Sequence, residues 1–107
     1  MSGGSSFSSD QTTLNKTTGA ASALRVGRTR VTSIQGRGEA GSVLSLHDAA
    51  TAGAASGANL KAIYRYETEG LEVYVPGSGI LFKLGLIATL TQTTGTDGSV
   101  TVTITGA

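Results

Sequence analysis

Hydrophobic and polar residues alternate along most of the chain from residue 24 onward. The clearest case lies near the C-terminus, where Val100, Val102 and Ile104 are separated by single threonines. Alternation with a period of two is typical of a β-strand with one face buried and the other in water. The same pattern predicts strands in the following further segments: 24–34, 43–47, 60–67, 71–75 and 84–90.

Turn-forming residues separate these segments. Glu69-Gly70, the run Pro76-Gly77-Ser78-Gly79 and the pair Asp97-Gly98 each fall between two predicted strands. Glycine adopts the backbone angles that tight turns need, and proline cannot donate to a strand ladder. The pattern therefore predicts an all-β fold, a compact six- to seven-stranded antiparallel sandwich or jelly-roll-like barrel. We also expect segments 84–90 and 100–104 to pair as a hairpin around the Asp-Gly turn.

The opening strand has an irregular pattern. Leu24, Val26 and Ile34 share one parity, whereas Val31 has the other. Such a break indicates either a β-bulge or a strand that is covered on both faces. From the regular strands we expect Val73, Leu86, Val102 and Ile104 to be core residues.

Two segments lack the alternation. Residues 49–58 contain only small or polar side chains and are predicted to form a surface loop. Residues 1–23 are polar apart from a few small side chains, Phe7 and Leu14, and bury too little apolar surface to fold alone. We therefore divide the chain into an N-terminal assembly arm (1–23), with Phe7 and Leu14 as anchors, and a sandwich domain (24–107). The alternative is an arm that packs on its own domain.

The composition indicates assembly more than nucleic-acid or membrane binding. Eight basic and seven acidic residues give a formal net charge of +1, unlike the strongly basic surface of a nucleic-acid binder. Charged residues make up 14% of the chain, against about 25% in an average soluble domain. No apolar run reaches the ~18 residues of a membrane span. The chain has no cysteine, so disulfides and thiolate metal sites are excluded.

Four of the five arginines lie close together in the sequence: Arg25, Arg28, Arg30 and Arg37. They are candidates either for DNA phosphate contacts or for a protein interface, where the planar guanidinium pairs with carboxylates. No aromatic residues are interleaved with them, so we favour the interface. We expect Arg28 and Arg30 to project from the same face of the first strand.

Catalytic residues are hard to find in this sequence. His47 is the single histidine, and a Ser/His/Asp triad would have to use it with Asp48 or Asp97. No nucleophile-elbow motif accompanies these residues. We therefore expect a non-enzymatic protein without cofactor or metal, in which His47 faces solvent or an interface.

An acidic group surrounds the turn at Glu69-Gly70. Glu67, Glu69 and Glu72 offer either a paired-carboxylate site, oxygen ligands for a cation such as Ca²⁺, or a solvated hairpin tip. Arg65 lies nearby in the sequence and could neutralise part of this charge. The solvated tip is our expectation.

Beyond residue 24 the sequence resembles a known group of proteins. The segments that carry the resemblance are RVGRTRVTSI, GSVLSLHDAATAGAASG, LEVYVPGSGILF and LIATLTQTTGTDGSVTVTITG. They are similar to small β-sandwich virion proteins of tailed, podovirus-like phages of aquatic bacteria, over roughly four-fifths of the chain. The first 23 residues do not take part. The resemblance implies a structural role in the virion, assembled in the host cytoplasm, without catalytic residues to carry over.

The sequence thus favours a capsid decoration or accessory head protein. Its partners would be the major capsid protein or another virion protein, and further copies of itself. The first alternative is a tail, head–tail adaptor or fibre-attachment component. A carbohydrate-binding module is a lesser alternative, because three Tyr, two Phe and no Trp offer few aromatic platforms.

Overall fold

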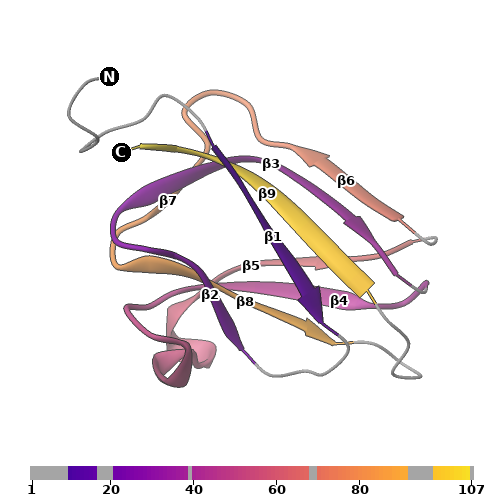
Figure 1. The fold of residues 1–107 in the computed structure, drawn as a ribbon, viewed down its shortest axis with the longest axis horizontal. Coiled ribbons are helices and arrows are strands. Elements are labelled where there is room, and N and C mark those ends of the chain that lie inside the picture. The colour runs from indigo at the N-terminus through magenta and orange to yellow at the C-terminus, as the bar shows by residue number, and fades with distance from the viewer. Residues whose placement is uncertain (1–9, 17–20, 39, 68–69, 92–97, 107) are drawn as a thin grey trace.

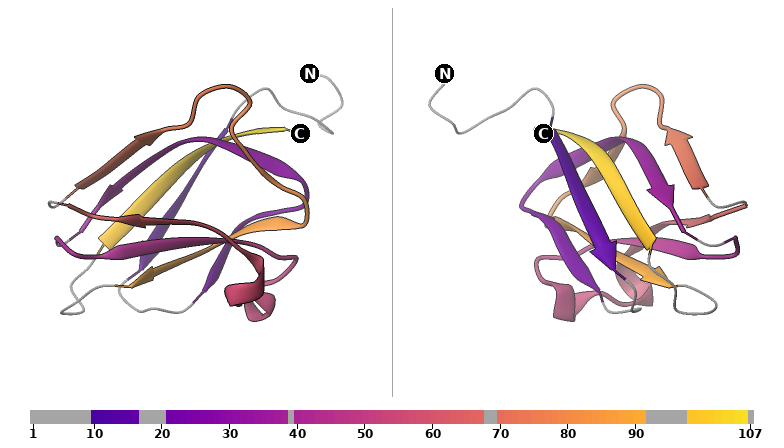
Figure 2. Two further views of the ribbon diagram at one scale, coloured as in Figure 1. Left: turned by 180° about the vertical axis from the view of Figure 1, so that it is seen from behind. Right: turned by 45° about the vertical axis from the view of Figure 1, so that its right-hand side comes forward.

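The chain folds into two antiparallel β-sheets packed face to face (Figures 1 and 2). The computed structural model describes residues 10–16, 21–38, 40–67, 70–91 and 98–106. Within these residues the strands are β1 (Asp10–Lys16), β2 (Ser22–Val26), β3 (Thr29–Arg37), β4 (Val43–Asp48), β5 (Leu60–Arg65), β6 (Gly70–Tyr74), β7 (Ile80–Phe82), β8 (Gly85–Thr91) and β9 (Gly98–Gly106). The predicted all-β sandwich is confirmed, although these nine strands exceed the six or seven expected.

The strands divide into a five-stranded and a four-stranded sheet. Sheet A has the order β1-β9-β3-β6, and β7 pairs with the first part of β3. Sheet B has the order β2-β8-β4-β5. The predicted 49–58 loop joins β4 to β5 and contains two 3₁₀ turns, η1 (Ala52–Ala54) and η2 (Gly57–Asn59). None of the residues in these two turns is buried.

The hydrophobic core lies between the two sheets. In β9 the inward residues Val100, Val102 and Ile104 are fully buried, whereas the threonines between them are partly exposed. Leu86 is also fully buried, and Val73 is partly buried against the core. Alternation therefore identified the inward side of these strands correctly.

Tyr66 joins the two sheets across this core. Its backbone extends the pairing of β4 and β5, because Tyr66 N–H donates to Ser42 O at 2.8 Å. Its side chain is fully buried and reaches sheet A, where the hydroxyl donates to Ser99 O at 3.0 Å. Burial raises the pKa of Tyr66 to about 12. Gly36 of β3 leaves room for the ring, since a Cβ there would overlap the Tyr66 hydroxyl.

The irregular pattern in β3 is a bulge, the first of the two alternatives that the sequence left open. The pairing of β3 with β9 shifts register between Val31 and Ser33. The extra residue brings both Val31 and Ile34 to the buried side, although they are three positions apart.

The opening strand that we predicted from Leu24 onward is two strands in different sheets. The chain leaves β2 at Gly27, whose φ of +92° suits glycine, and enters β3 two residues later. Gly27 N–H donates to Leu84 O at 3.0 Å, which fixes the crossing point. The expectation that Val26 shares a buried face with Ile34 is wrong, because Val26 is 74% exposed.

The expected hairpin of segments 84–90 and 100–104 does not form. β8 pairs with β2 and β4 in sheet B, and β9 pairs with β1 and β3 in sheet A. β8 and β9 each have a strongly apolar inward side, and a strand of either sheet can bury such a side in the core. Alternation therefore did not reveal that the connection crosses between the sheets.

Part of the proposed arm belongs to the sandwich. β1 pairs with β9 along its whole length, and Thr12 Oγ1 donates to Leu24 O in β2 at 3.2 Å. The edge of β9 supplies hydrogen-bond partners for the backbone N–H and C=O groups of residues 10–16, although most of their side chains are polar. The division at residue 23 therefore does not coincide with a structural boundary. Residues 1–9 lie outside the described part, and their role as an assembly arm stays a prediction.

The register of β9 makes a direct stability prediction. Val102→Ala removes buried methyl groups and should lower the free energy of unfolding by about 1–3 kcal/mol. Thr103→Ala, on the outer side of the same strand, should change it by less than about 1 kcal/mol. Chemical denaturation of both variants measures the difference. Equal losses would mean that the register is wrong by one residue.

Candidate interaction surface

The outer side of sheet A carries rows of polar side chains across four strands. The strand register aligns Glu72, Gln35, Thr101 and Thr13 in one row. The rows on either side are Tyr74, Ser33, Thr103 and Gln11, and Gly70, Arg37 and Ser99. We call these three rows the polar face.

Hydrogen bonds between neighbouring strands order part of the polar face. The hydroxyls of Thr13 and Thr101 lie 2.9 Å apart, and Gln11 Nε2 donates to Thr103 Oγ1 at 3.3 Å. Cross-strand pairs of this kind stabilise a sheet modestly. They also hold the side chains of β1 and β9 in fixed positions on the surface.

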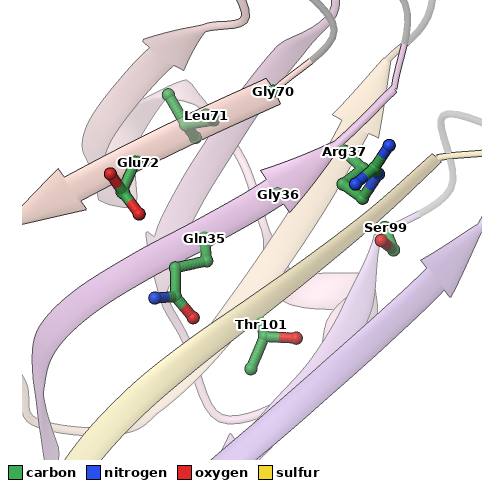
Figure 3. A pocket seen from close by; sticks show the side chains of 8 residues that line it. All are labelled: Gln35, Gly36, Arg37, Gly70, Leu71, Glu72, Ser99 and Thr101. Carbon is green, nitrogen blue, oxygen red and sulfur yellow. The ribbon is translucent and has the colours of Figure 1, made fainter.

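A shallow depression lies at one end of the polar face, over β6, β3 and β9 (Figure 3). Its lining residues are Gln35, Gly36, Arg37, Gly70, Leu71, Glu72, Ser99 and Thr101. Arg37 and Glu72 are the charged side chains among them, and both are exposed. Hydroxyl, amide and ionic groups therefore share one surface, which suits hydrogen bonding to a polar partner.

The structure does not bring the four arginines together. Arg25 is partly buried in β2 of sheet B, and Arg28 is exposed in the bend before β3. Arg30 and Arg37 lie near opposite ends of β3, roughly 20 Å apart at the rise of an extended strand. The expectation that Arg28 and Arg30 share a strand face is wrong, because the crossing at Gly27 places Arg28 outside the strand.

The other proposed interface residues are less well defined. Phe7 lies outside the described residues. Leu14 is in β1, where it is aligned with Val100 of β9. An interface role for Phe7, Leu14 and the arginines stays a prediction, and only Arg37 among them belongs to the polar face.

His47 supports the loop between β4 and β5. Its Nδ1 lies 2.9 Å from Ser56 O and 3.1 Å from Asn59 Oδ1. Both are acceptors, so Nδ1 carries the proton and donates to them. Asn59 Nδ2 in turn donates to Ala54 O at 2.8 Å. This arrangement fixes the two 3₁₀ turns beside sheet B.

Asp48 supports the start of β8 instead of activating His47. Its carboxylate accepts hydrogen bonds from the backbone N–H groups of Lys83 and Leu84, at 3.0 and 2.8 Å, and of Gly85 at 3.4 Å. Partial burial opposes the charged form, but these donors and the charge of Lys61 outweigh it and lower the pKa of Asp48. The formal triad with Asp48 therefore does not form. Asp97 lies outside the described residues.

The expected hairpin tip does not form, because β5 and β6 belong to different sheets and do not pair. Glu67 is exposed after β5, Glu72 is exposed in β6, and Glu69 lies outside the described residues. Within the described part of the chain, no three His, Cys, Asp or Glu side chains are grouped as metal ligands would be. In the same residues, no helix is long and apolar enough to cross a membrane.

The comparisons with known proteins concern the fold. No protein-family model matches the sequence, and no curated protein matches it. The chain is similar to the pre-peptidase C-terminal domain of a collagenase from Bacillus anthracis, with 16% identity, a TM-score of 0.51 and coverage of 88% of each chain. It is also similar to a chain of the capsid asymmetric unit of cyanophage Pam1, with 16% identity and a TM-score of 0.43, over 98% of this chain and 89% of that one. At 16% identity the similarity to the collagenase domain concerns the fold alone. The TM-score for the capsid chain is too low to support a conclusion.

Sequence reasoning missed the polar face as a unit. The threonines of β9 were recognised as outward residues, but their neighbours in β1, β3 and β6 depend on a register that alternation does not encode. It also missed the structural role of Asp48, whose partners lie about 35 residues away along the chain. The positions of the cross-strand partners were the missing information.

Asp48 predicts a specific pH dependence of stability. Because its pKa is lowered in the folded state, its contribution is present above the unfolded pKa and is lost as the pH falls through the folded pKa. Asp48→Asn should lower the free energy of unfolding at neutral pH by about 1–2 kcal/mol. Denaturation between neutral and strongly acidic pH should show this difference shrinking as the pH falls. Glu67→Gln is the control, and a pH-independent difference for Asp48→Asn would contradict the assignment.

Proposed function

We propose that the chain is a non-enzymatic structural subunit of a tailed-phage virion, where it acts as a capsid decoration or accessory head protein. It binds the capsid lattice through the major capsid protein or another virion protein. The observation that carries the proposal is the polar face. It is a continuous sheet surface with many hydrogen-bonding groups and only two charged side chains among its three rows.

The chemistry of the polar face fits a protein partner. Hydroxyl and amide side chains lose little on desolvation when a partner supplies matching donors and acceptors. The β1–β9 hydrogen bonds already hold several of them in place, which reduces the entropy lost on docking. A rigid sheet therefore presents a pre-organised surface for a repeating lattice.

The ionisable residues support a structural role as well. His47 and Asp48, the strongest candidates for chemistry, both hold backbone segments in place. The sequence resemblance to small virion proteins of tailed phages points in the same direction. A decoration protein needs a stable scaffold and a docking surface, and in this proposal the sandwich and the polar face serve as these two.

Counting copies tests the location. Phage particles that encode this chain are purified by density, and its amount is measured by quantitative mass spectrometry relative to the major capsid protein. A head decoration protein should approach the copy number of the capsid protein. A tail, adaptor or fibre component should reach only a small fraction of it, and absence from washed particles would contradict the proposal.

A matched pair of variants tests the polar face itself. Thr101→Lys places an unpaired charge at its centre, and Thr91→Lys places the same charge at an exposed site of sheet B. Burying that charge at an interface is costly, so Thr101→Lys should reduce incorporation into particles by about tenfold or more. Thr91→Lys should incorporate normally. Equal incorporation of two folded variants would exclude the polar face as the docking surface.

A further inference from the structure

Two consecutive strands leave free edges on the same side of the sandwich. β5 pairs with β4 and β6 pairs with β3, and within the described residues each strand is the last of its sheet on that side. The two strands run in opposite directions (Figure 1). A free edge presents unpaired backbone N–H and C=O groups that another strand can satisfy.

Apolar side chains lie along this open side. Ala62 and Tyr64 of β5, with Leu71 and Val73 of β6, pack against the core but are only partly buried. The opposite side of the sandwich is closed, because Thr12 of β1 donates to Leu24 O of β2. The open side therefore leaves part of the apolar core without cover.

The outward residues of the two edges complement each other. β5 presents Ile63, which is 56% exposed, and Arg65, whereas β6 presents Glu72 and Tyr74, which is 78% exposed. An antiparallel alignment that sets Arg65 opposite Glu72 also sets Ile63 opposite Tyr74. On the inner side the same alignment sets Tyr64 opposite Val73. Neither Arg65 nor Glu72 has an ion-pair partner among the described residues.

Pairing of like edges is less favourable. Two β5 strands aligned antiparallel about Ile63 would set Lys61 of each opposite Arg65 of the other. Like charges directly opposite each other destabilise a strand pair. The charges therefore select β6 as the partner of β5.

β5 and β6 follow each other in the chain, and the alignment with Arg65 opposite Glu72 is one that they could adopt in a hairpin. In the structure they enter different sheets, and their complementary edges stay apart. We propose that a second copy of the chain pairs with both, β5 of each copy joining β6 of the other. A two-fold axis parallel to the strands makes both pairings antiparallel and equivalent, which gives a closed, isologous dimer.

The dimer deepens the proposed function by specifying the building unit that binds the lattice. It is tested on the purified chain, without particles. Its failure is therefore distinguishable from a failure of the virion assignment, which the copy count decides.

Charge exchange tests the pairing by sedimentation velocity over a range of concentrations. The natural chain should be a dimer, and either Arg65→Glu or Glu72→Arg should weaken it by about tenfold or more. The double variant Arg65→Glu/Glu72→Arg should restore dimerisation. Arg28→Glu, which reverses an exposed charge away from both edges, is the control and should leave the dimer unchanged.

Cysteine pairing tests the alignment independently, since the chain has no cysteine of its own. A mixture of Ile63→Cys and Tyr74→Cys proteins should form a covalent heterodimer on mild oxidation, because the Cβ atoms of opposite residues lie about 5 Å apart and a small movement of the edge strands brings them to disulfide distance. Ile63→Cys alone should cross-link far less. Val26→Cys mixed with Tyr74→Cys is the control for random collisions between exposed sites.

These measurements decide the proposal in either direction. A natural chain that stays monomeric, or forms a trimer or larger ring, overturns it. A dimer that is insensitive to Arg65→Glu, or is not restored by the double exchange, also overturns it. All variants lie at exposed positions, and circular dichroism with thermal melting confirms that they are folded.

Discussion

The side chain of Tyr66 links the two sheets across the core by a buried hydrogen bond. Its backbone belongs to sheet B, and its hydroxyl ends on Ser99 of sheet A. The hydroxyl end of the ring lies against Gly36 of β3, where a Cβ would overlap it. A buried hydroxyl that lacked this acceptor would cost about 1–3 kcal/mol, so the bond stabilises the packing of Tyr66 against β9.

The two sides of the sandwich follow from this arrangement. On one side β1 and β2 approach closely enough for Thr12 to donate to Leu24. On the other side β5 and β6 diverge after Tyr66, and the buried ring fills the core beside them. Strand pairing holds β6, β3, β9 and β1 in one layer, and their outer side chains form the polar face. The free edges of β5 and β6 on the open side are those at which we propose dimerisation.

The sequence predicted side-chain orientation better than connectivity. Alternation identified Val102 and Ile104 as buried, and the break at Val31 pointed to a bulge or a strand covered on both faces, because both are local properties of a strand. It did not predict that the chain crosses between sheets at Gly27 or between β8 and β9. Whether a strand joins sheet A or sheet B depends on which sheet it pairs with while its apolar side is buried. Both sheets offer a similar core environment, so the pattern of a single strand does not decide this.

The polar face was predictable only in part for the same reason. The arginines are close in sequence, yet the crossing at Gly27 and the length of β3 separate them. The polar face instead combines residues from four strands, and only the threonines of β9 had a recognisable local pattern. Its composition is visible in the sequence, but its assembly depends on the register of β1, β3 and β6 with β9.

The role of Tyr66 is the central claim, and a double-mutant cycle with Gly36 tests it most directly. Gly36→Ala adds a Cβ that overlaps the Tyr66 hydroxyl, so it should lower the free energy of unfolding by about 1–3 kcal/mol. In a Tyr66→Leu background the hydroxyl is gone, and most of that loss should disappear, giving a coupling of about 1 kcal/mol or more. Gly53→Ala, at a position with open space, is the control. The same loss from Gly36→Ala in both backgrounds would show that Tyr66 does not lie against β3 and would contradict the account.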